Sequence, residues 1–270
     1  MTFSKIFSAV ALGLVAAGSA HSALVIDTFD IGQDSVSVTG AATNNIVAPL
    51  TTSAAGVSLY QTNMAGAAGS TNSIVATSAD ILGLERDIAV ARVSGTNRVE
   101  AIVDGGGQFV FDQGNSTTGF AIVRWDGAVG DWTNSVKVDG LGGADLSTEG
   151  IQILVGTNVD NAGLNYKMTF QVWTETVLNS NVWTLSEVTK TITSNGGDKD
   201  VGFMFSDFSG ANFARVGAIQ MIVNTGAGSA GGLDFSIDIV GAVPEPGSLA
   251  LAGLALAGLG MAGRRRKAAK

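Results

Sequence analysis

The sequence lacks cysteine altogether and contains one histidine and three prolines among its 270 residues. The single histidine, His21, lies near the N-terminus, so residues 23–243, which we call the body of the chain, have none. Without these residue types the body cannot form a disulfide, a His/Cys zinc site, or a Ser-His-Asp or Cys-His catalytic relay. Carboxylate and oxygen chemistry is what remains.

Positive charge is also scarce. Residues 23–243 hold 9 Lys and Arg against 22 Asp and Glu, a net charge of −13. Because phosphate binding requires a cationic surface, this charge argues against DNA or RNA as a partner. Apolar residues make up 46% of the chain, so the composition is that of a folded protein rather than a disordered one. A body of this length is large enough to bury one sizeable core.

The N-terminal segment has the three-part layout of a secretory signal peptide. Lys5 precedes an uncharged stretch at residues 6–20, and small residues follow around Ala20 and Ser22. This order predicts a signal helix within residues 1–22, removed by signal peptidase after Ala20 or Ser22. A retained membrane anchor is the alternative, but the apolar stretch is short for a bilayer span. We therefore expect an exported protein.

The C-terminal segment contains three parts in a fixed order. Pro244, Glu245 and Pro246 come first, and residues 246–263 are uncharged. A helix of this length measures about 27 Å, close to the ~30 Å hydrocarbon core of a bilayer. Four consecutive cations follow: Arg264, Arg265, Arg266 and Lys267. The pattern predicts a transmembrane helix at about 248–263 and a basic tail at 264–270 that stays in the cytoplasm, with the prolines exposed on the exported side.

This arrangement of residues 243–270 resembles the PEP-CTERM sorting signal of Gram-negative bacteria. The resemblance implies recognition by an exosortase, a membrane-embedded cysteine protease, with processing near Pro244, Glu245 and Pro246. It also implies export through the inner membrane, a transient membrane anchor, and delivery to the cell surface or extracellular matrix. An ordinary single-pass anchor, with the prolines acting as a linker, is the alternative.

Between the two ends the apolar residues alternate with a period of two. Residues 164–172 and 233–239 show this clearly, and Asp234 and Asp238 lie on the polar face of the second run. Further predicted strands include residues 183–193, 201–205 and 216–223, and the turns between them are rich in glycine, of which the chain holds 37. The stretch 41–78 is predicted to hold loops and short edge strands. The pattern predicts one all-β domain at 23–243, a two-sheet antiparallel sandwich of jelly-roll type.

Short segments of the body are similar to domains that commonly precede such tails, which resemble galactose-binding-like jelly rolls. The matching segments are residues 25–29, 125–127, 139–146, 208–223 and 233–239. The resemblance implies that the first and last strands are neighbours. It supports the fold rather than a ligand.

If the terminal strands pair, four carboxylates come within reach of one another: Asp27, Asp30, Asp234 and Asp238. An all-oxygen site of this kind suits calcium, the cofactor that the acidic composition favours. Two other acidic groups are further candidates for such a site: Asp139, Asp145 and Glu149, and Asp198, Asp200 and Asp207. None has EF-hand spacing, and the alternative is that these acids form turns and carry solubilising charge.

Aromatic side chains suggest contact with a carbohydrate, because sugar rings stack on exposed indoles. Trp132 lies in a polar loop, and Trp173 is out of phase with the apolar residues of 164–172, so these two are the candidates. The alternative is that they belong to the core, as Trp125 and Trp183 can.

An enzyme is weakly supported by the sequence. A glycoside hydrolase needs only two carboxylates, and Glu100, Glu149 and Glu175 are the residues to test. None of them has a distinctive setting, so we predict no catalytic activity. The sequence favours a structural or adhesive protein of the exopolysaccharide or biofilm layer, with a carbohydrate-binding module as the alternative and a carboxylate glycosidase third.

Overall fold

The computed structural model describes residues 24–38, 69–75, 80–104, 106–127, 136–148, 150–160, 163–178, 180–223 and 232–243. The predicted signal helix, transmembrane helix and basic tail all lie outside these residues. The strands are β1 (Leu24–Asp27), β2 (Gln33–Val38), β3 (Gly69–Val75), β4 (Glu85–Ser94), β5 (Val99–Val103), β6 (Phe109–Gln113), β7 (Thr118–Trp125), β8 (Gln152–Val159), β9 (Asn165–Glu175), β10 (Trp183–Thr193), β11 (Gly197–Met204), β12 (Val216–Val223) and β13 (Phe235–Val243).

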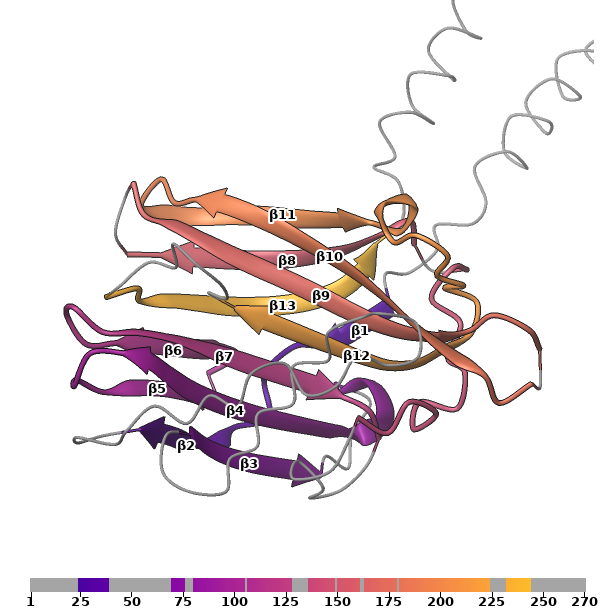
Figure 1. Ribbon diagram of the computed structural model, residues 1–270, viewed down its shortest axis with the longest axis horizontal. Coiled ribbons are helices and arrows are strands. Elements are labelled where there is room, and N and C mark those ends of the chain that lie inside the picture. Colours follow the sequence, from indigo (N-terminus) through magenta and orange to yellow (C-terminus); the bar gives the residue numbers. More distant parts are fainter. Residues whose placement is uncertain are drawn as a thin grey trace, which may run out of the picture.

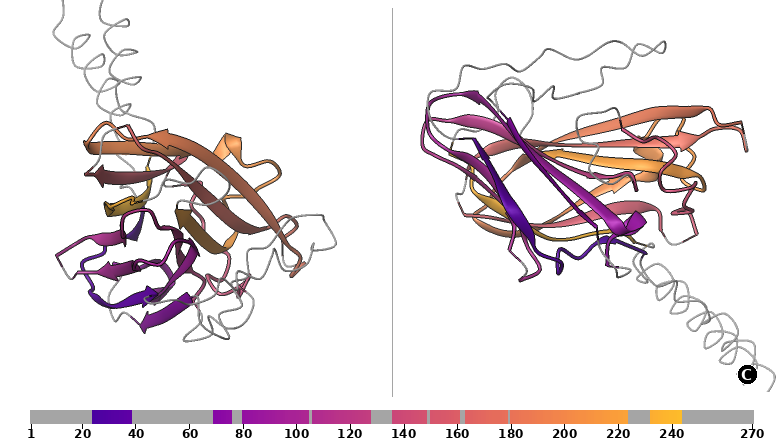
Figure 2. Two further views of the ribbon diagram at one scale, coloured as in Figure 1. Left: turned by 60° about the vertical axis from the view of Figure 1, so that its left-hand side comes forward. Right: turned by 90° about the horizontal axis from the view of Figure 1, so that it is seen from below.

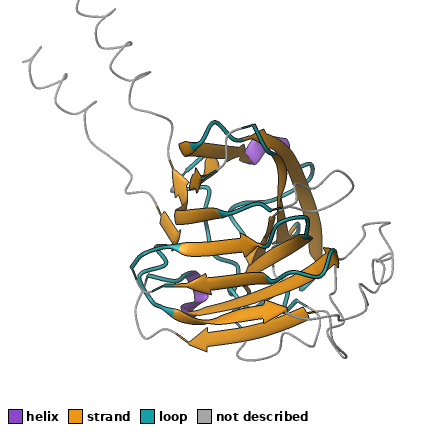
Figure 3. Cartoon of the chain, turned by 90° about the vertical axis from the view of Figure 1, so that its left-hand side faces the viewer, coloured by secondary structure: helices purple, strands orange, loops and turns teal. Residues whose placement is uncertain are grey.

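The strands form two antiparallel sheets that pack into a sandwich, which confirms the predicted fold class. One sheet has seven strands, in the order β11-β8-β13-β6-β5-β2 with β1 paired to β13, and the other has the order β10-β9-β12-β7-β4-β3. In each sheet the early strands lie toward one edge and the later strands toward the other. Figure 1 shows β2–β5 together along one edge of the sandwich and β8–β11 along the opposite edge, and both views in Figure 2 show the same division. The described helices are two 3-10 turns, η1 (Leu82–Leu84) and η2 (Phe205–Asp207), which are the purple segments of Figure 3.

The period of two in the sequence places one row of each strand in a common core. In β9, Tyr166, Met168, Phe170 and Val172 are fully buried and join the main core cluster between the sheets. β9 pairs with β10 along its whole length, from Trp183 opposite Glu175 to Thr193 opposite Asn165. β3, within the stretch predicted to hold short edge strands, is indeed at the edge of its sheet.

The first and last strands of the body lie side by side. β1 pairs antiparallel with β13, with Leu24 opposite Ala242 and Asp27 opposite Val240. β13 also pairs with β8 and β6, so the last strand sits inside the seven-stranded sheet rather than at its edge. The chain therefore enters and leaves the domain at the same end.

Within the described ranges, no helix has the length and apolar character needed to cross a membrane.

Candidate functional site

A hollow with a volume of about 160 Å³ lies on the outer face of the seven-stranded sheet. Its lining comes from β8, β11, β13 and the residue before β6: Gln108, Gly156, Thr157, Asn158, Asp198, Lys199, Asp200, Ser236 and Asp238. The register brings these together, because Asp198 and Ser236 both pair with Asn158, and Asp200 pairs with Gly156. We call this hollow the polar pocket.

A bulge in β13 shapes the floor of the polar pocket. The pairing with β8 slips between Ile237 and Ile239, which leaves Asp238 over Gly156. A Cβ atom at position 156 would lie 2.2 Å from Oδ1 of Asp238, so the glycine makes room for the carboxylate. Asn158 donates a hydrogen bond from Nδ2 to Oδ1 of Asp198 at 2.7 Å. The pocket thus offers three carboxylates, two amides and two hydroxyls, groups suited to hydrogen bonds with sugar hydroxyls.

The structure groups the acids differently from the sequence analysis. Asp198 and Asp200 lie on the same face of β11, because residues two apart on a strand share a face. Asp238 of β13 lies against Gly156, the β8 residue that pairs with Asp200, and so joins them in the polar pocket. Asp207 was expected with them, but it follows the end of β11 in η2 and forms an ion pair with Lys190 at 3.4 Å. The alternation Asp198-Lys199-Asp200 and a glycine inside β8 were the signals that could have located this pocket. Asn158 and Ser236 carried no such signal.

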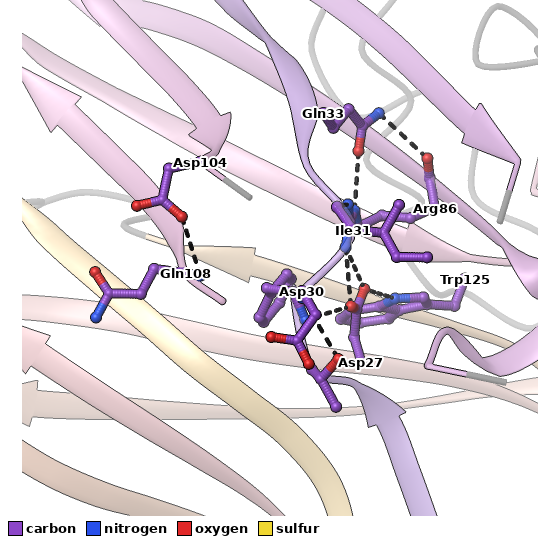
Figure 4. A network of polar contacts seen from close by, with 10 residues as sticks. Asp27, Asp30, Ile31, Gln33, Arg86, Asp104, Gln108 and Trp125 are labelled. Carbon is purple, nitrogen blue, oxygen red and sulfur yellow. Dashed lines mark hydrogen bonds and ion pairs between the residues drawn. The ribbon is translucent and has the colours of Figure 1, made fainter. Parts of the chain in front are cut away.

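Asp27 holds a buried polar network instead of facing a metal site. Its carboxylate accepts two hydrogen bonds from Nη1 of Arg86, at 2.8 and 3.0 Å, and one from Nε1 of Trp125 at 2.8 Å. The backbone N–H of Phe29 donates a further bond at 2.8 Å. Nε of Arg86 donates to Oε1 of Gln33, and Figure 4 shows the side chains converging on Asp27.

Both members of this ion pair are fully buried. Burial raises the pKa of Asp27 above its usual range, opposed by the nearby Arg86 charge and the hydrogen bonds from Trp125 and Phe29. Burial likewise lowers the pKa of Arg86, opposed by Asp27. Since β1 belongs to one sheet and β4 and β7 to the other, the network ties the two sheets together.

The four aspartates predicted as a calcium site do not form one cluster. β1 and β13 pair as that hypothesis required, but Asp27 points inward between the sheets whereas Asp238 is exposed on the outer face. Asp30 is exposed near Gly107, and Asp234 precedes β13 at the opposite end. No group of three or more His, Cys, Asp or Glu in the described part of the chain is arranged to hold a metal ion. Asp145 of the second acidic group accepts hydrogen bonds within its own turn.

Asp234 instead lies beside two other acids. Its Oδ1 accepts a hydrogen bond from the backbone N–H of Gln113 at 3.1 Å. Burial, followed by the hydrogen bond and charge of Asp112 and the charge of Asp160, raises the pKa of Asp234 to about 6. Arg98 forms ion pairs with Asp112 and Glu100 at this end of the sheet.

Of the two tryptophans predicted to contact a carbohydrate, the one that the structure describes, Trp173, gives little exposed aromatic surface. Trp173 lies on the face of β9 away from the core, as its phase predicted, but it is only 4% exposed. A sugar ring therefore cannot stack on it in this conformation. Trp125 is fully buried and bonded to Asp27, and Trp132 lies outside the described residues.

The described glutamates named for hydrolysis are engaged in structural ion pairs. Glu175 is 1% exposed, and its Oε2 accepts hydrogen bonds from Nε and Nη2 of Arg215 at 3.0 and 2.5 Å. Glu100 pairs with Arg98 at 2.6 Å. Glu149 lies outside the described residues.

Comparisons with solved structures find β-sandwich carbohydrate-binding modules. A family 11 module from Clostridium thermocellum, in complex with a β-1,3-1,4-mixed-linked tetrasaccharide, is 12% identical, with coverage of 67% of this chain and 92% of that module and a TM-score of 0.32. A family 30 carbohydrate-binding module is 12% identical, with coverage of 83% and 89% and a TM-score of 0.33. At these identities the likeness concerns the fold alone. No curated protein sequence matches the chain.

The tail does match a family model. The model of the PEP-CTERM protein-sorting motif covers residues 242–267, starting inside β13 and extending beyond the described residues. This motif implies export, a membrane-anchored C-terminus and processing by an exosortase. The chain is therefore a β-sandwich protein that carries a PEP-CTERM protein-sorting motif at its C-terminal end.

Proposed function

We propose that this protein is a substrate of the sorting pathway of a Gram-negative bacterium, with a non-catalytic structural or adhesive role in the exopolysaccharide or biofilm layer. Signal peptidase removes residues 1–22, and the segment at about 248–263 anchors the chain with residues 264–270 in the cytoplasm. The exosortase then acts near Pro244, Glu245 and Pro246 and delivers the body to the cell surface or extracellular matrix. The observation that carries this proposal is the sorting motif at residues 242–267, joined directly to the last strand of the sandwich.

Replacement of Pro244, Glu245 and Pro246 by alanine tests the sorting step. We expect export to continue and C-terminal processing to stop, because the exosortase loses the proline-flanked peptide. The intact mass of the protein in the membrane and matrix fractions measures the outcome. Replacement of Gly247 and Ser248 by alanine is the matched control, expected to be processed as usual. Identical C-terminal masses for the triple variant and the unchanged protein would favour a plain membrane anchor.

The polar pocket supports carbohydrate binding as a second candidate function. Its carboxylates and amide lie on one rigid sheet face, and Asp198, Asp200 and Asp238 outnumber the one cation in the lining, Lys199. Neutral sugar hydroxyls can donate to these oxygens, whereas phosphate or sulfate groups would meet like charge.

Binding of the exopolysaccharide purified from the producing cell tests this candidate. Asp200→Asn combined with Asp238→Asn is expected to weaken binding roughly thirtyfold, since each hydrogen bond to a charged acceptor contributes about 1 kcal/mol. Asp207→Asn, which alters an exposed acid outside the pocket, should bind normally. Trp132→Ala and Trp173→Ala test the aromatic hypothesis in the same assay. If all variants bind the exopolysaccharide equally, neither the polar pocket nor the two tryptophans take part in carbohydrate binding.

A further inference from the structure

The connection between β9 and β10 carries an unusual concentration of exposed apolar side chains. Val177 is 64% exposed, Leu178 is 66% exposed and Val182 is 59% exposed. We call residues 176–182 the hairpin tip. Their sequence, Thr-Val-Leu-Asn-Ser-Asn-Val, contains no charged residue, although the body as a whole has a net charge of −13. Large apolar side chains grouped in this way on an otherwise acidic protein indicate a contact surface.

The hairpin tip is held at its base by hydrogen bonds, several of them made by the buried residue Glu175. Oε1 of Glu175 accepts a hydrogen bond from the backbone N–H of Asn181 at 3.0 Å, while Oε2 binds the guanidinium of Arg215. Nδ2 of Asn212 donates to the backbone oxygen of Glu175 at 3.0 Å. The N–H of Ser180 donates to the carbonyl of Val177 at 3.1 Å. The apolar side chains are therefore presented on a preformed loop, so docking loses little conformational entropy.

The hairpin tip projects from the end of the sandwich at which the sorting motif begins. In one sheet β9 ends at Glu175, and β12 starts nearby with Val216 opposite Thr174. The two sheets are linked at this end by hydrogen bonds from Leu146 to Phe213, from Gly150 to Leu146 and from Ile151 to Val243. Figure 1 shows β13 pointing toward the side to which the β9–β10 connection extends. Leu84, in η1, is a further exposed apolar side chain at this end.

Only residues 244–247 separate β13 from the proposed membrane-spanning segment. Even fully extended, the five backbone steps from Val243 to Ser248 measure at most roughly 18 Å. This end of the sandwich must therefore stay next to the bilayer while the tail is inserted. An acidic surface is repelled by anionic lipid headgroups, but the uncharged tip is not.

We propose that the hairpin tip is a lipid-contacting element that inserts Val177, Leu178 and Val182 into the exported-side surface of the bilayer while the tail is anchored. This inference rests on the proposed membrane anchoring of the tail. The contact fixes the tilt of the sandwich, so that the sorting peptide is held close to the membrane surface. Once the tail is removed, only Val177, Leu178 and Val182 hold the body to the bilayer. This contact is too weak by itself, so the protein then leaves the membrane.

The absence of cysteine allows a direct test with single introduced thiols. Leu178→Cys and Asn195→Cys are labelled with an environment-sensitive fluorophore in the full chain, reconstituted in vesicles of phosphatidylethanolamine and phosphatidylglycerol. Asn195 is exposed in the β10–β11 turn at the opposite end, so it is the matched control. Lipids carrying a nitroxide below the headgroup should quench the label at position 178 and leave that at 195 bright.

A second comparison separates lipid contact from mere proximity. Combining Leu178→Cys with Val177→Ser and Val182→Ser should lower the docked population about fivefold for each valine, since each buried apolar side chain contributes about 1 kcal/mol. Ile239→Ser, at an exposed apolar residue on the sheet face, should leave the quenching unchanged. Vesicle flotation is measured in parallel. Flotation without quenching at 178 overturns the tip contact alone, whereas loss of flotation overturns the membrane anchor and the tip contact together.

Discussion

The buried pair of Asp27 and Arg86 gives the sharpest stability prediction. In the unchanged protein, Nη1 of Arg86 donates to both carboxylate oxygens of Asp27. In Asp27→Asn the side chain has no charge and only one oxygen, so at most one of these two hydrogen bonds remains. Arg86 remains fully buried without its counter-charge. Breaking a buried pair in this way costs about 3–5 kcal/mol, which for a body of this size lowers the melting temperature by roughly 6–20 °C.

Thermal unfolding followed by tryptophan fluorescence measures this loss, and Trp125 reports on the network directly because it donates to Asp27. Asp207→Asn is the control, since its partner Lys190 is partly exposed and the pair should contribute less than about 1 kcal/mol. Combining Asp27→Asn with Arg86→Met should restore part of the lost stability, because the unpaired charge is removed. A melting temperature for Asp27→Asn within the error of the unchanged protein would refute the reasoning.

Three other predictions concern single positions. Because the pKa of Asp234 is raised to about 6, the stability that its protonated form provides is present at low pH and is lost as the pH rises through about 6. Denaturant midpoints should therefore fall between about pH 4 and pH 6.5, from the ordinary carboxyl pKa to the raised one, and Asp234→Asn should flatten that fall. Gly217→Ala should lower the free energy of unfolding by more than about 2 kcal/mol, since its Cβ would lie 1.9 Å from the carbonyl oxygen of Val138. Gly163→Ala is the control: its Cβ would meet open space, and only the positive φ of +84° should cost about 1 kcal/mol in the same denaturation experiments. Glu175→Gln should lower stability by about 1–3 kcal/mol and leave any sugar release from exopolysaccharide unchanged, because the carboxylate is committed to Arg215.

The strands were predictable wherever a strand alternates apolar and polar residues or is buried on both faces. The predicted strands at 183–193 and 216–223 match β10 and β12 residue for residue. β11 starts at Gly197, earlier than the apolar run from Val201, because its polar residues pair with β8 in the sheet. Cross-strand pairing of this kind is set by the partner strand and cannot be seen in one segment.

The side-chain clusters were less predictable than the fold. Asp27 was predicted to share an all-oxygen calcium site with Asp30, Asp234 and Asp238, yet its partner is Arg86, which lies 59 residues later on the other sheet. The polar pocket depends on a bulge in β13, which shifts Asp238 over Gly156 and has no signature in the sequence. Register and bulges arise from the packing of whole sheets, so they escape a reading of single segments.

The interior position of β13 has a consequence for secretion. In the proposed export route, β6 and β8 have no strand between them, and the seven-stranded sheet is split in two, until the residues of β13 have crossed the membrane. The strand that closes the sheet is then the last part of the body to cross, only a few residues ahead of the proposed anchor. On this route the domain completes its folding as the proposed anchor enters the lipid.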